Sequence, residues 1–266
     1  MSKTMTRRTS LRALLAAALP LFVPLATGAA EPSKPAHIVI MIGEDEYKTW
    51  ETVPAFAKSD LEPRGYRVTI IQADPADKNN FPGLVQALRE ADLLFISVRR
   101  RTPYKEQLDA IREYLNAGKP LVGIRTTCHA FALRPKDTLT DPKLAVWQEF
   151  DPEVLGGHYV GHHGNTIKCT ITVAPGAESH PILKGIAVAK LVGNGSLYKV
   201  SPLDPTAQPL LIGTIPDKPA EPVAWTRLYG AKQARIFFAP LGHVDDFQNP
   251  EFRRLLVNAV AWALGR

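Results

Sequence analysis

The chain has 266 residues, of which 45% are hydrophobic and 22% charged, and this composition excludes a disordered or low-complexity protein. Its formal net charge is +6, but residues 1–30 contain four basic residues and no acidic ones, so the remainder carries only +2. Nucleic-acid-binding domains concentrate positive charge in their folded part, so we expect no nucleic-acid partner.

The first thirty residues have the three parts of a secretory signal peptide. A basic start is followed by an apolar stretch at residues 11–27 and a small-residue end at residues 28–30. The pair Arg7 and Arg8 is also typical of a twin-arginine signal, with the general secretory route as the alternative. A membrane anchor is disfavoured because the apolar stretch is short and contains prolines. We expect cleavage near Ala30, a periplasmic or secreted protein, and no membrane span after cleavage.

Helical and strand periods alternate through the first half of the remaining chain. Short apolar or β-branched runs predict strands, while apolar residues spaced three or four apart predict helices. This alternation favours an α/β fold, with a mostly parallel sheet and helices on both faces. The expected strands are residues 37–42, 66–71, 92–98 and 120–124, and the expected helices are residues 49–64, 81–90 and 103–116.

The second half is less regular, and residues 130–165 have no clean period. Further apolar runs predict strands at the far edge of the sheet, and a final amphipathic segment predicts a helix. No linker or internal repeat interrupts the chain, so we expect a single domain over residues 37–266. The later strands are residues 166–173, 209–215, 221–226 and 234–239, and the final helix is residues 252–264.

Four polar segments directly follow predicted strands. Ligands of open α/β sheets bind beyond the carboxyl ends of the strands, so we expect these segments to converge on one site. The segments are residues 43–47, 99–101, 125–129 and 242–246. The candidate substrate-binding residues in and near them are Glu44, Asp45, Tyr47, Arg99, His129 and Tyr159.

Arg125 stands where a strand enters a tight turn, the position that carries the nucleophile in a nucleophile elbow. Arginine stays protonated and cannot act as a nucleophile, but its guanidinium group can bind a carboxylate, a phosphate or a polarised carbonyl. Cys128 follows three residues later and is either a reactive thiol at a helix start or a packed one. We favour a packed thiol, and we expect Cys128 and Cys169 to be separate buried residues rather than a disulfide.

His243 follows the last predicted strand, with Asp245 two residues later. This arrangement is typical of a proton-transferring histidine that a carboxylate orients. Asp245 and its neighbour Asp246 can also cap the following helix, so the two can divide these roles. We therefore predict His243, Asp245 and Arg125 as catalytic residues.

Three histidines, His158, His162 and His163, lie within six residues among several glycines. Two of them with a third ligand can hold zinc or another divalent metal and leave a coordination position open. The alternative is a loop in which the imidazoles form local hydrogen bonds, and the spacing matches no familiar zinc motif. No cofactor is therefore certain, and a divalent metal is a hypothesis.

Short motifs along residues 37–264 together resemble one known family. They are residues 123–124 with His129, 154–159 with His162, 179–182, 197–198, 222–225, 235–238 with 241–243, and Asn258 with 262–263. These motifs resemble the ThuA-like, or trehalose utilisation, family within the class I glutamine amidotransferase-like superfamily. The resemblance implies a flavodoxin-like three-layer sandwich. It places the amidotransferase nucleophile at Arg125, which excludes glutamine hydrolysis by that route, and it places His243 and Asp245 near the superfamily's His and Glu. Commoner members tend to carry histidine at the Arg125 position.

The resemblance implies an exported protein of carbohydrate metabolism, related to trehalose or to an oxidised sugar. A small-molecule carbohydrate would bind at the carboxyl edge of the sheet, where Arg125 anchors an oxygen, His243 moves a proton and Asp245 orients His243. If the protein is an enzyme, a sugar-modifying hydrolase or isomerase fits these roles. One alternative is a non-catalytic module that binds a carbohydrate or a protein. Another is a metal-dependent hydrolase centred on the clustered histidines.

Overall fold

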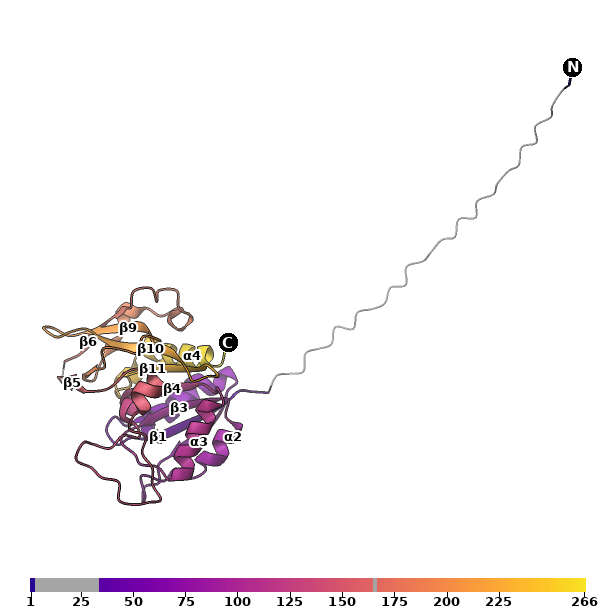
Figure 1. Cartoon of the computed structure of the whole chain (residues 1–266). Helices are drawn as coiled ribbons and strands as arrows, with labels where there is room; N and C mark the ends of the chain where they lie inside the picture. Colours follow the sequence, from indigo (N-terminus) through magenta and orange to yellow (C-terminus); the bar gives the residue numbers. More distant parts are fainter. Residues whose placement is uncertain (3–33, 165–166) are drawn as a thin grey trace. The chain divides into compact units, whose positions relative to one another are not determined.

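The computed structural model describes residues 1–2, 34–164 and 167–266. The chain divides into two units, Met1–Lys34 and Pro35–Arg266, and the helices and strands described below belong to the second (Figure 1). The predicted signal peptide, apart from its first two residues, lies outside the described residues. Among the residues that the structure describes, none forms a helix long and apolar enough to span a bilayer.

A nine-stranded sheet forms the centre of the larger unit, in the order β2-β1-β3-β4-β11-β10-β9-β6-β7. The strands from β2 to β11 in this order pair in parallel, and the remaining pairs are antiparallel. A separate small sheet pairs β5 (Gly161–His163) with β8 (Leu197–Lys199). The large sheet consists of β1 (His37–Gly43), β2 (Arg67–Gln72), β3 (Leu93–Val98), β4 (Leu121–Ile124), β6 (Cys169–Val173), β7 (Val192–Gly193), β9 (Gln208–Thr214), β10 (Glu221–Tyr229) and β11 (Ala234–Ala239).

Helices cover both faces of this sheet. Side chains alternate along β1, so Ile38, Ile40 and Ile42 face one apolar cluster while Val39 and Met41 face the other. The first cluster contains apolar residues of α1 and α4, and the second contains those of α2 and α3. This arrangement confirms the predicted α/β sandwich. The helices are α1 (Thr49–Phe56), α2 (Leu84–Glu90), α3 (Lys105–Asn116) and α4 (Pro250–Ala263).

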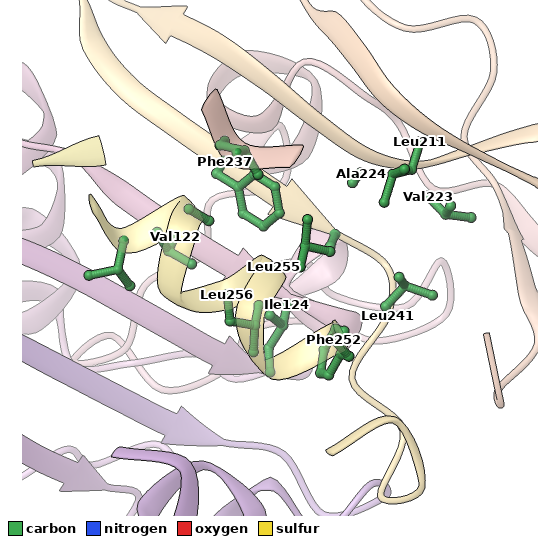
Figure 2. Close-up of a cluster of buried hydrophobic side chains, with 14 of the residues drawn as sticks. Val122, Ile124, Leu211, Val223, Ala224, Phe237, Leu241, Phe252, Leu255 and Leu256 are labelled. Atoms are coloured by element: carbon green, nitrogen blue, oxygen red, sulfur yellow. The ribbon is translucent and has the colours of Figure 1, made fainter. Parts of the chain in front are cut away.

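Figure 2 shows the apolar stripe of α4 against the sheet, with Leu255 and Leu256 lying over Val122, Ile124 and Phe237. All five side chains are almost fully buried. Burying a leucine or phenylalanine side chain contributes about 1.5–3 kcal/mol, so this stripe anchors the C-terminal helix. The anchored helix in turn holds the end of β11, from which one loop of the site begins.

Two expectations differ in detail from the structure. The helix expected over residues 49–64 is α1 followed by a π-helical segment, Ala57–Leu61, and a 3₁₀ turn, Glu62–Arg64, before Gly65. The sheet is parallel only up to β11, because the connections from β9 to β10 and from β10 to β11 are short loops. Short connections allow only antiparallel pairing, since a parallel return needs a crossover of a dozen or more residues.

Candidate functional site

A cavity of ≈ 260 Å³ lies beyond the carboxyl ends of the parallel strands. The loops after β1, β3, β4 and β11 all contribute to it, as the ligand rule for open α/β sheets predicts. A further contribution comes from the small β5–β8 sheet and the segment before it. The lining residues are Glu46, Tyr47, Arg99, Arg125, His129, Tyr159, His162, Gly195, Ser196, Tyr198 and His243.

Arg125 forms the floor of this cavity at the end of β4. Its backbone has φ 43°, in the left-handed region that non-glycine residues rarely adopt, and its side chain is only 2% exposed. The guanidinium carbon lies 4.3 Å from the ring centroid of Tyr47 and 4.5 Å from that of Tyr198. Cation–π contacts of this kind strengthen when water is excluded. The elbow expected at this position therefore presents a buried cation clamped between two aromatic rings.

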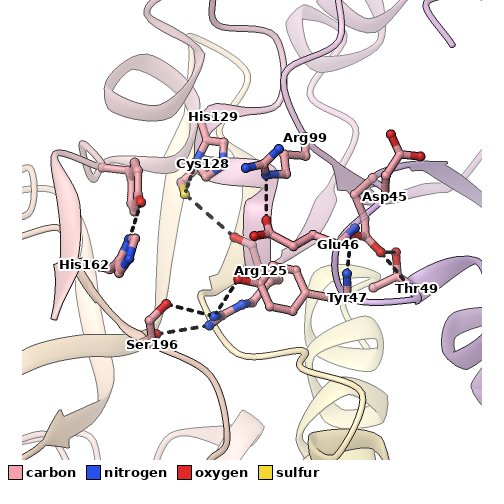
Figure 3. Close-up of polar contacts among 12 residues, drawn as sticks. Asp45, Glu46, Tyr47, Thr49, Arg99, Arg125, Cys128, His129, His162 and Ser196 are labelled. Atoms are coloured by element: carbon pink, nitrogen blue, oxygen red, sulfur yellow. Dashed lines mark hydrogen bonds and ion pairs between the residues drawn. The ribbon is translucent and has the colours of Figure 1, made fainter. Parts of the chain in front are cut away.

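The terminal nitrogens of Arg125 are hydrogen-bonded within the protein (Figure 3). Nη1 donates to the carbonyl oxygens of Ser196, at 3.2 Å, and Pro240, at 2.8 Å. Nη2 donates to the Tyr47 hydroxyl and to Ser196 Oγ, both at 3.2 Å. Each of these hydroxyls accepts from a cation and keeps its own proton free to donate. Arg125 thus polarises two hydroxyl groups, those of Tyr47 and Ser196, in the lining of the cavity.

Gly195 makes this packing possible. A Cβ atom at this position would lie 2.2 Å from Arg125 Nη2 and 2.5 Å from Cζ, which no real side chain tolerates. The backbone of residues 194–196 therefore passes directly against the edge of the guanidinium. No candidate site residue was predicted in this segment, although its sequence Gly193-Asn194-Gly195-Ser196 is a signal for close backbone approach.

His129 lies beside Arg125 and is almost buried. Burial, followed by the nearby Arg100, Arg99 and Arg125, lowers the pKa of its imidazole to about 3. The ring is therefore neutral at physiological pH. Its centroid lies 4.7 Å from that of Tyr159, and Nδ1 is 3.2 Å from the Cys128 sulfur.

The two cysteines behave as the sequence predicted. Cys128 and Cys169 are both free and buried. Burial raises the pKa of the Cys128 thiol well above its usual value, so the thiol stays protonated and unreactive. Cys128 is therefore a packed residue beneath the cavity.

Two further contacts shape the rim. Arg99 Nε pairs with Glu46 at 2.8 Å, and both side chains are partly exposed. The Tyr159 hydroxyl lies 2.9 Å from His162 Nδ1, which brings β5 to the cavity. Glu46 was not among the predicted site residues, and Tyr198 was noted only as part of a motif, because neither has a chemical signature on its own.

His243 lies on the loop after β11, with its ring edge-on to Tyr47 at a centroid distance of 5.9 Å. The Asp245 backbone N–H donates to His243 Nδ1 at 3.3 Å, so the neutral ring carries its proton on Nε2. The Asp245 carboxylate, with a side chain 66% exposed, lies 3.6 Å from Nδ1, within ion-pair distance once His243 is protonated.

Asp246 is the carboxylate that organises this loop. It is 1% exposed and accepts hydrogen bonds from the backbone N–H groups of Gly242, His243 and Asn194, and from Asn194 Nδ2. A single buried side chain thereby ties the loop that carries His243 to the segment that packs against Arg125. The sequence indicated that the two adjacent aspartates could divide their roles, and the structure places the buried, bonded role at Asp246.

Two predicted substrate-binding acids do not line this cavity. Glu44 is buried and accepts from the backbone N–H groups of Glu46, Tyr47 and Thr49 and from Thr49 Oγ1, so it holds the turn after β1. Asp45 points to the other side of that turn, where it pairs with Arg101 and with Lys78. Glu44 therefore bonds within its own turn and Asp45 pairs with Arg101 and Lys78, so neither acid pairs with Arg125.

The three clustered histidines separate. His158 lies 3.1 Å from Asp151, His162 contacts Tyr159, and His163 is 3.9 Å from Glu221. Among residues 34–164 and 167–266, no three His, Cys, Asp or Glu side chains are grouped so that they could hold a metal ion. Zinc or another divalent metal stays a prediction that rests on sequence alone.

Comparison with known proteins gives consistent results. The sequence matches the family model ThuA, described as trehalose utilisation, over residues 38–263. The fold is similar to a ThuA-like protein from Bacteroides uniformis ATCC 8492, with 17% identity and a TM-score of 0.64 over 89% of this chain and 94% of that one. A ThuA-like protein from Parabacteroides merdae ATCC 43184 matches with 16% identity and a TM-score of 0.61, over 87% of this chain and 90% of that one.

A larger enzyme contains a similar fold. The chain matches 31% of a beta-galactosidase from Rahnella sp. R3, with 15% identity and a TM-score of 0.57 over 85% of this chain. No curated protein matches the chain. At these identities, likeness to the solved structures establishes the fold and leaves the chemistry of the site to its own residues.

Proposed function

The chain belongs to the ThuA family, and on that premise we propose that it binds a carbohydrate in the cavity above Arg125. The observation that carries this proposal is the pair of hydroxyls, on Tyr47 and Ser196, that accept from Arg125 Nη2 and remain free to donate. Sugar oxygens are acceptors for such donors, and a buried cation behind each donor strengthens the bond. A cavity volume of ≈ 260 Å³ suits a single sugar ring rather than a macromolecule.

Aromatic residues support the same ligand class. Tyr47, Tyr159 and Tyr198 line the cavity together with His129 and His162. Sugar rings have apolar C–H faces that pack on aromatic rings, and their hydroxyl groups form hydrogen bonds with polar groups that line the cavity. A cavity with tyrosine rings and several hydrogen-bonding groups therefore suits a neutral polyhydroxylated ring better than an apolar ligand.

His243 is the proposed proton carrier. In its imidazolium form His243 can donate the Nε2 proton to a leaving or rearranging sugar oxygen and become a neutral imidazole, and the Asp245 carboxylate, 3.6 Å from Nδ1, stabilises the charged form before the transfer. Arg125 holds the oxygen-binding hydroxyls in place. These roles suit a sugar-modifying hydrolase or isomerase, acting on trehalose-related or oxidised sugars. Glutaminase activity is not proposed, because arginine at the elbow position cannot act as a nucleophile.

We also propose that the protein is exported and works in the periplasm or outside the cell. This proposal rests on the basic, apolar and small-residue parts of residues 1–30. Neither cysteine needs a partner in an oxidising compartment, because both thiols are buried in the fold.

A non-catalytic sugar-binding module is the second candidate. The observation that favours it is His243 Nδ1, which accepts from a backbone N–H rather than donating to a carboxylate. A histidine base is normally oriented by an acceptor on this nitrogen. Binding without turnover of any sugar would favour this candidate over the enzyme.

Calorimetry with a panel of sugars and keto-sugars tests the proposal. Tyr47→Phe and Ser196→Ala each remove one donor, so each should weaken binding about fivefold, the effect of losing about 1 kcal/mol. Tyr229→Phe removes a tyrosine hydroxyl from β10, outside the cavity, and serves as the matched control.

The variants also separate the two candidates. His243→Ala should abolish turnover of a bound sugar while leaving most of its affinity if the protein is an enzyme. Failure of every sugar to bind the wild-type protein, or equal affinities in all three hydroxyl variants, would refute sugar binding in this cavity.

A further inference from the structure

A second histidine lines the Arg125 cavity, on the side opposite His243. His162 lies on β5, with its ring centroid 6.4 Å from that of Tyr198. The ring of His243 lies 5.9 Å from that of Tyr47. The Arg125 guanidinium lies against both tyrosine rings, and Figure 3 shows His162 on one side of Arg125 and Tyr47 on the other. Each imidazole therefore lies beside a different ring of the clamp around the buried cation.

The two imidazoles differ in the partner of their Nδ1 atoms. At His243 the partner is the Asp245 backbone N–H, which can only donate, so the neutral ring carries its proton on Nε2. At His162 the partner is the Tyr159 hydroxyl, 2.9 Å away, and a hydroxyl can accept as well as donate. Burial raises the pKa of Tyr159, so its hydroxyl stays protonated. His162 can therefore donate Nδ1–H to Tyr159 and present a lone pair at Nε2.

The charged neighbours of the two histidines differ as well. The Asp245 carboxylate lies 3.6 Å from His243 Nδ1 and can stabilise the imidazolium form. In the described part of the chain, the histidines within ion-pair distance of a carboxylate are His158, His163 and His243, and not His162. His243 is thus equipped as a proton donor, whereas His162 is equipped as a proton acceptor.

The floor of the same cavity can stabilise negative charge on a ligand oxygen. The hydroxyls of Tyr47 and Ser196 both accept from Arg125 Nη2, so both lie at one end of the guanidinium and can donate into the cavity. Fixed donors of this kind stabilise the charge that develops on a carbonyl oxygen when a neighbouring C–H group loses its proton. A base, an acid and a binding site for an enolate oxygen together fit proton abstraction next to a carbonyl.

We propose that His162 is the general base of an enolisation, in which His243 is the general acid and the substrate is a sugar that carries a carbonyl group. His162 Nε2 takes the proton of a C–H group next to the carbonyl, and the electron pair of that bond forms a C=C bond. The π electrons of the carbonyl move to its oxygen, which receives the Nε2 proton of the His243 imidazolium. One proton leaves the substrate and one enters, so the step needs no oxidant or reductant.

The product of this step is an enediol. Reversal of the two transfers at the same carbon gives an epimer, and reversal at the neighbouring carbon gives an isomer with the carbonyl moved by one position. The proposal rests on sugar binding in this cavity, and it deepens that function by naming the reaction and its base.

The test follows deuterium uptake from heavy water by proton NMR, with the full chain. The probes are methyl glucopyranosides oxidised to a ketone at each secondary ring carbon in turn. The wild type should speed exchange of the C–H next to the ketone of at least one probe above the rate in buffer, and it should exchange no C–H of unoxidised methyl glucoside. His162→Ala should lower kcat for exchange at least about a hundredfold and leave KM within about threefold. Imidazole added to the buffer should restore part of the rate, because it replaces the missing base.

Two further variants complete the test, and circular dichroism checks that each is folded. Tyr159→Phe keeps the ring and removes the hydroxyl that orients His162, so it should lower kcat without raising KM, and it decides the question if His162→Ala does not fold. His180→Asn lies outside the cavity and keeps an acceptor for the Ile182 N–H. It is the matched control and should leave kcat unchanged.

The outcomes separate this proposal from sugar binding itself. Binding of an oxidised glucoside without exchange above the buffer rate would overturn the enolisation and leave sugar binding standing. Equal kcat in the wild type and His162→Ala would overturn the role of His162, as would a loss that comes with a raised KM and that imidazole does not restore. Absence of binding by every sugar of the calorimetric panel and every oxidised glucoside would overturn both proposals.

Discussion

His129 should make the stability of the fold depend on pH. Burial and the surrounding arginines lower its pKa to about 3 from the usual 6.5. In the unfolded chain the same imidazole takes up a proton as the pH falls below 6.5, whereas in the folded chain it does not. The unfolded state then binds more protons than the folded state. The stability that neutral His129 contributes to the fold is therefore fully present above pH 6.5, and it is lost progressively as the pH falls towards 3.

The magnitude follows from the two pKa values. Between pH 7.5 and pH 5.0 the unfolded state gains almost a full proton, and the free energy of unfolding should fall by about 2 kcal/mol through this residue alone. His129→Gln removes the titrating group and keeps a polar side chain. Between pH 7.5 and pH 5.0 the free energy of unfolding of the variant should therefore fall by about 2 kcal/mol less than that of the wild type.

Urea unfolding of both chains at the two pH values measures this difference. Leu115→Ala is a suitable control, because Leu115 is buried and apolar and should lower stability equally at both pH values. Equal losses of unfolding free energy in the wild type and His129→Gln would show that the fold does not hold His129 neutral. The conclusion that burial and the nearby arginines lower its pKa would then be wrong.

Four further predictions concern the same region. Gly195→Ala forces a Cβ into the Arg125 guanidinium, and we expect it to lower stability by about 1–3 kcal/mol in urea unfolding and to abolish sugar binding. Asp246→Ala leaves four N–H donors without their acceptor and should cost about 3–5 kcal/mol, whereas Asp245→Ala at the exposed neighbour should change stability by less than about 0.5 kcal/mol. The Cys128 thiol should react with a thiol reagent at pH 8 only after unfolding, and rapid labelling of the folded protein would contradict its burial. Dialysis against a chelator should leave the Tm unchanged, because the described histidines contact separate partners, and a chelator-induced drop in Tm would instead support the metal hypothesis.

Local patterning accounts for the elements that the sequence predicted well. The predominantly apolar runs of β1, β3 and β4 predict strands that are covered on both faces, and the structure buries every residue of these strands. The helical spacing of α3 and α4 was equally clear. Such patterns are local, because a residue faces the core or solvent according to its position within its own element.

The antiparallel half of the sheet was harder to predict. Strands β9, β10 and β11 were expected as elements, but their direction depends on loop geometry and on which neighbour each strand meets. The same limit applied to β5 and β8, which pair although they lie far apart in the sequence. Pairing between distant segments has no local signal in one sequence.

The sequence by itself determined that Arg125 occupies the turn after a central strand, that His243 follows the last strand, and that polar loops meet at one sheet edge. Only the tertiary structure decided what these residues contact. Ser196 lies 71 residues from Arg125 in the chain, and Asp246 lies 52 residues from Asn194, yet each pair is hydrogen-bonded. The position of a residue in the hydrophobic pattern of its strand or helix predicts whether its side chain is buried. Which residues it contacts depends on the order of the strands and on the paths of the loops. For this reason Glu46 lines the cavity while the neighbouring acids Glu44 and Asp45 do not, and Gly195, which has no side-chain chemistry, lies against the Arg125 guanidinium.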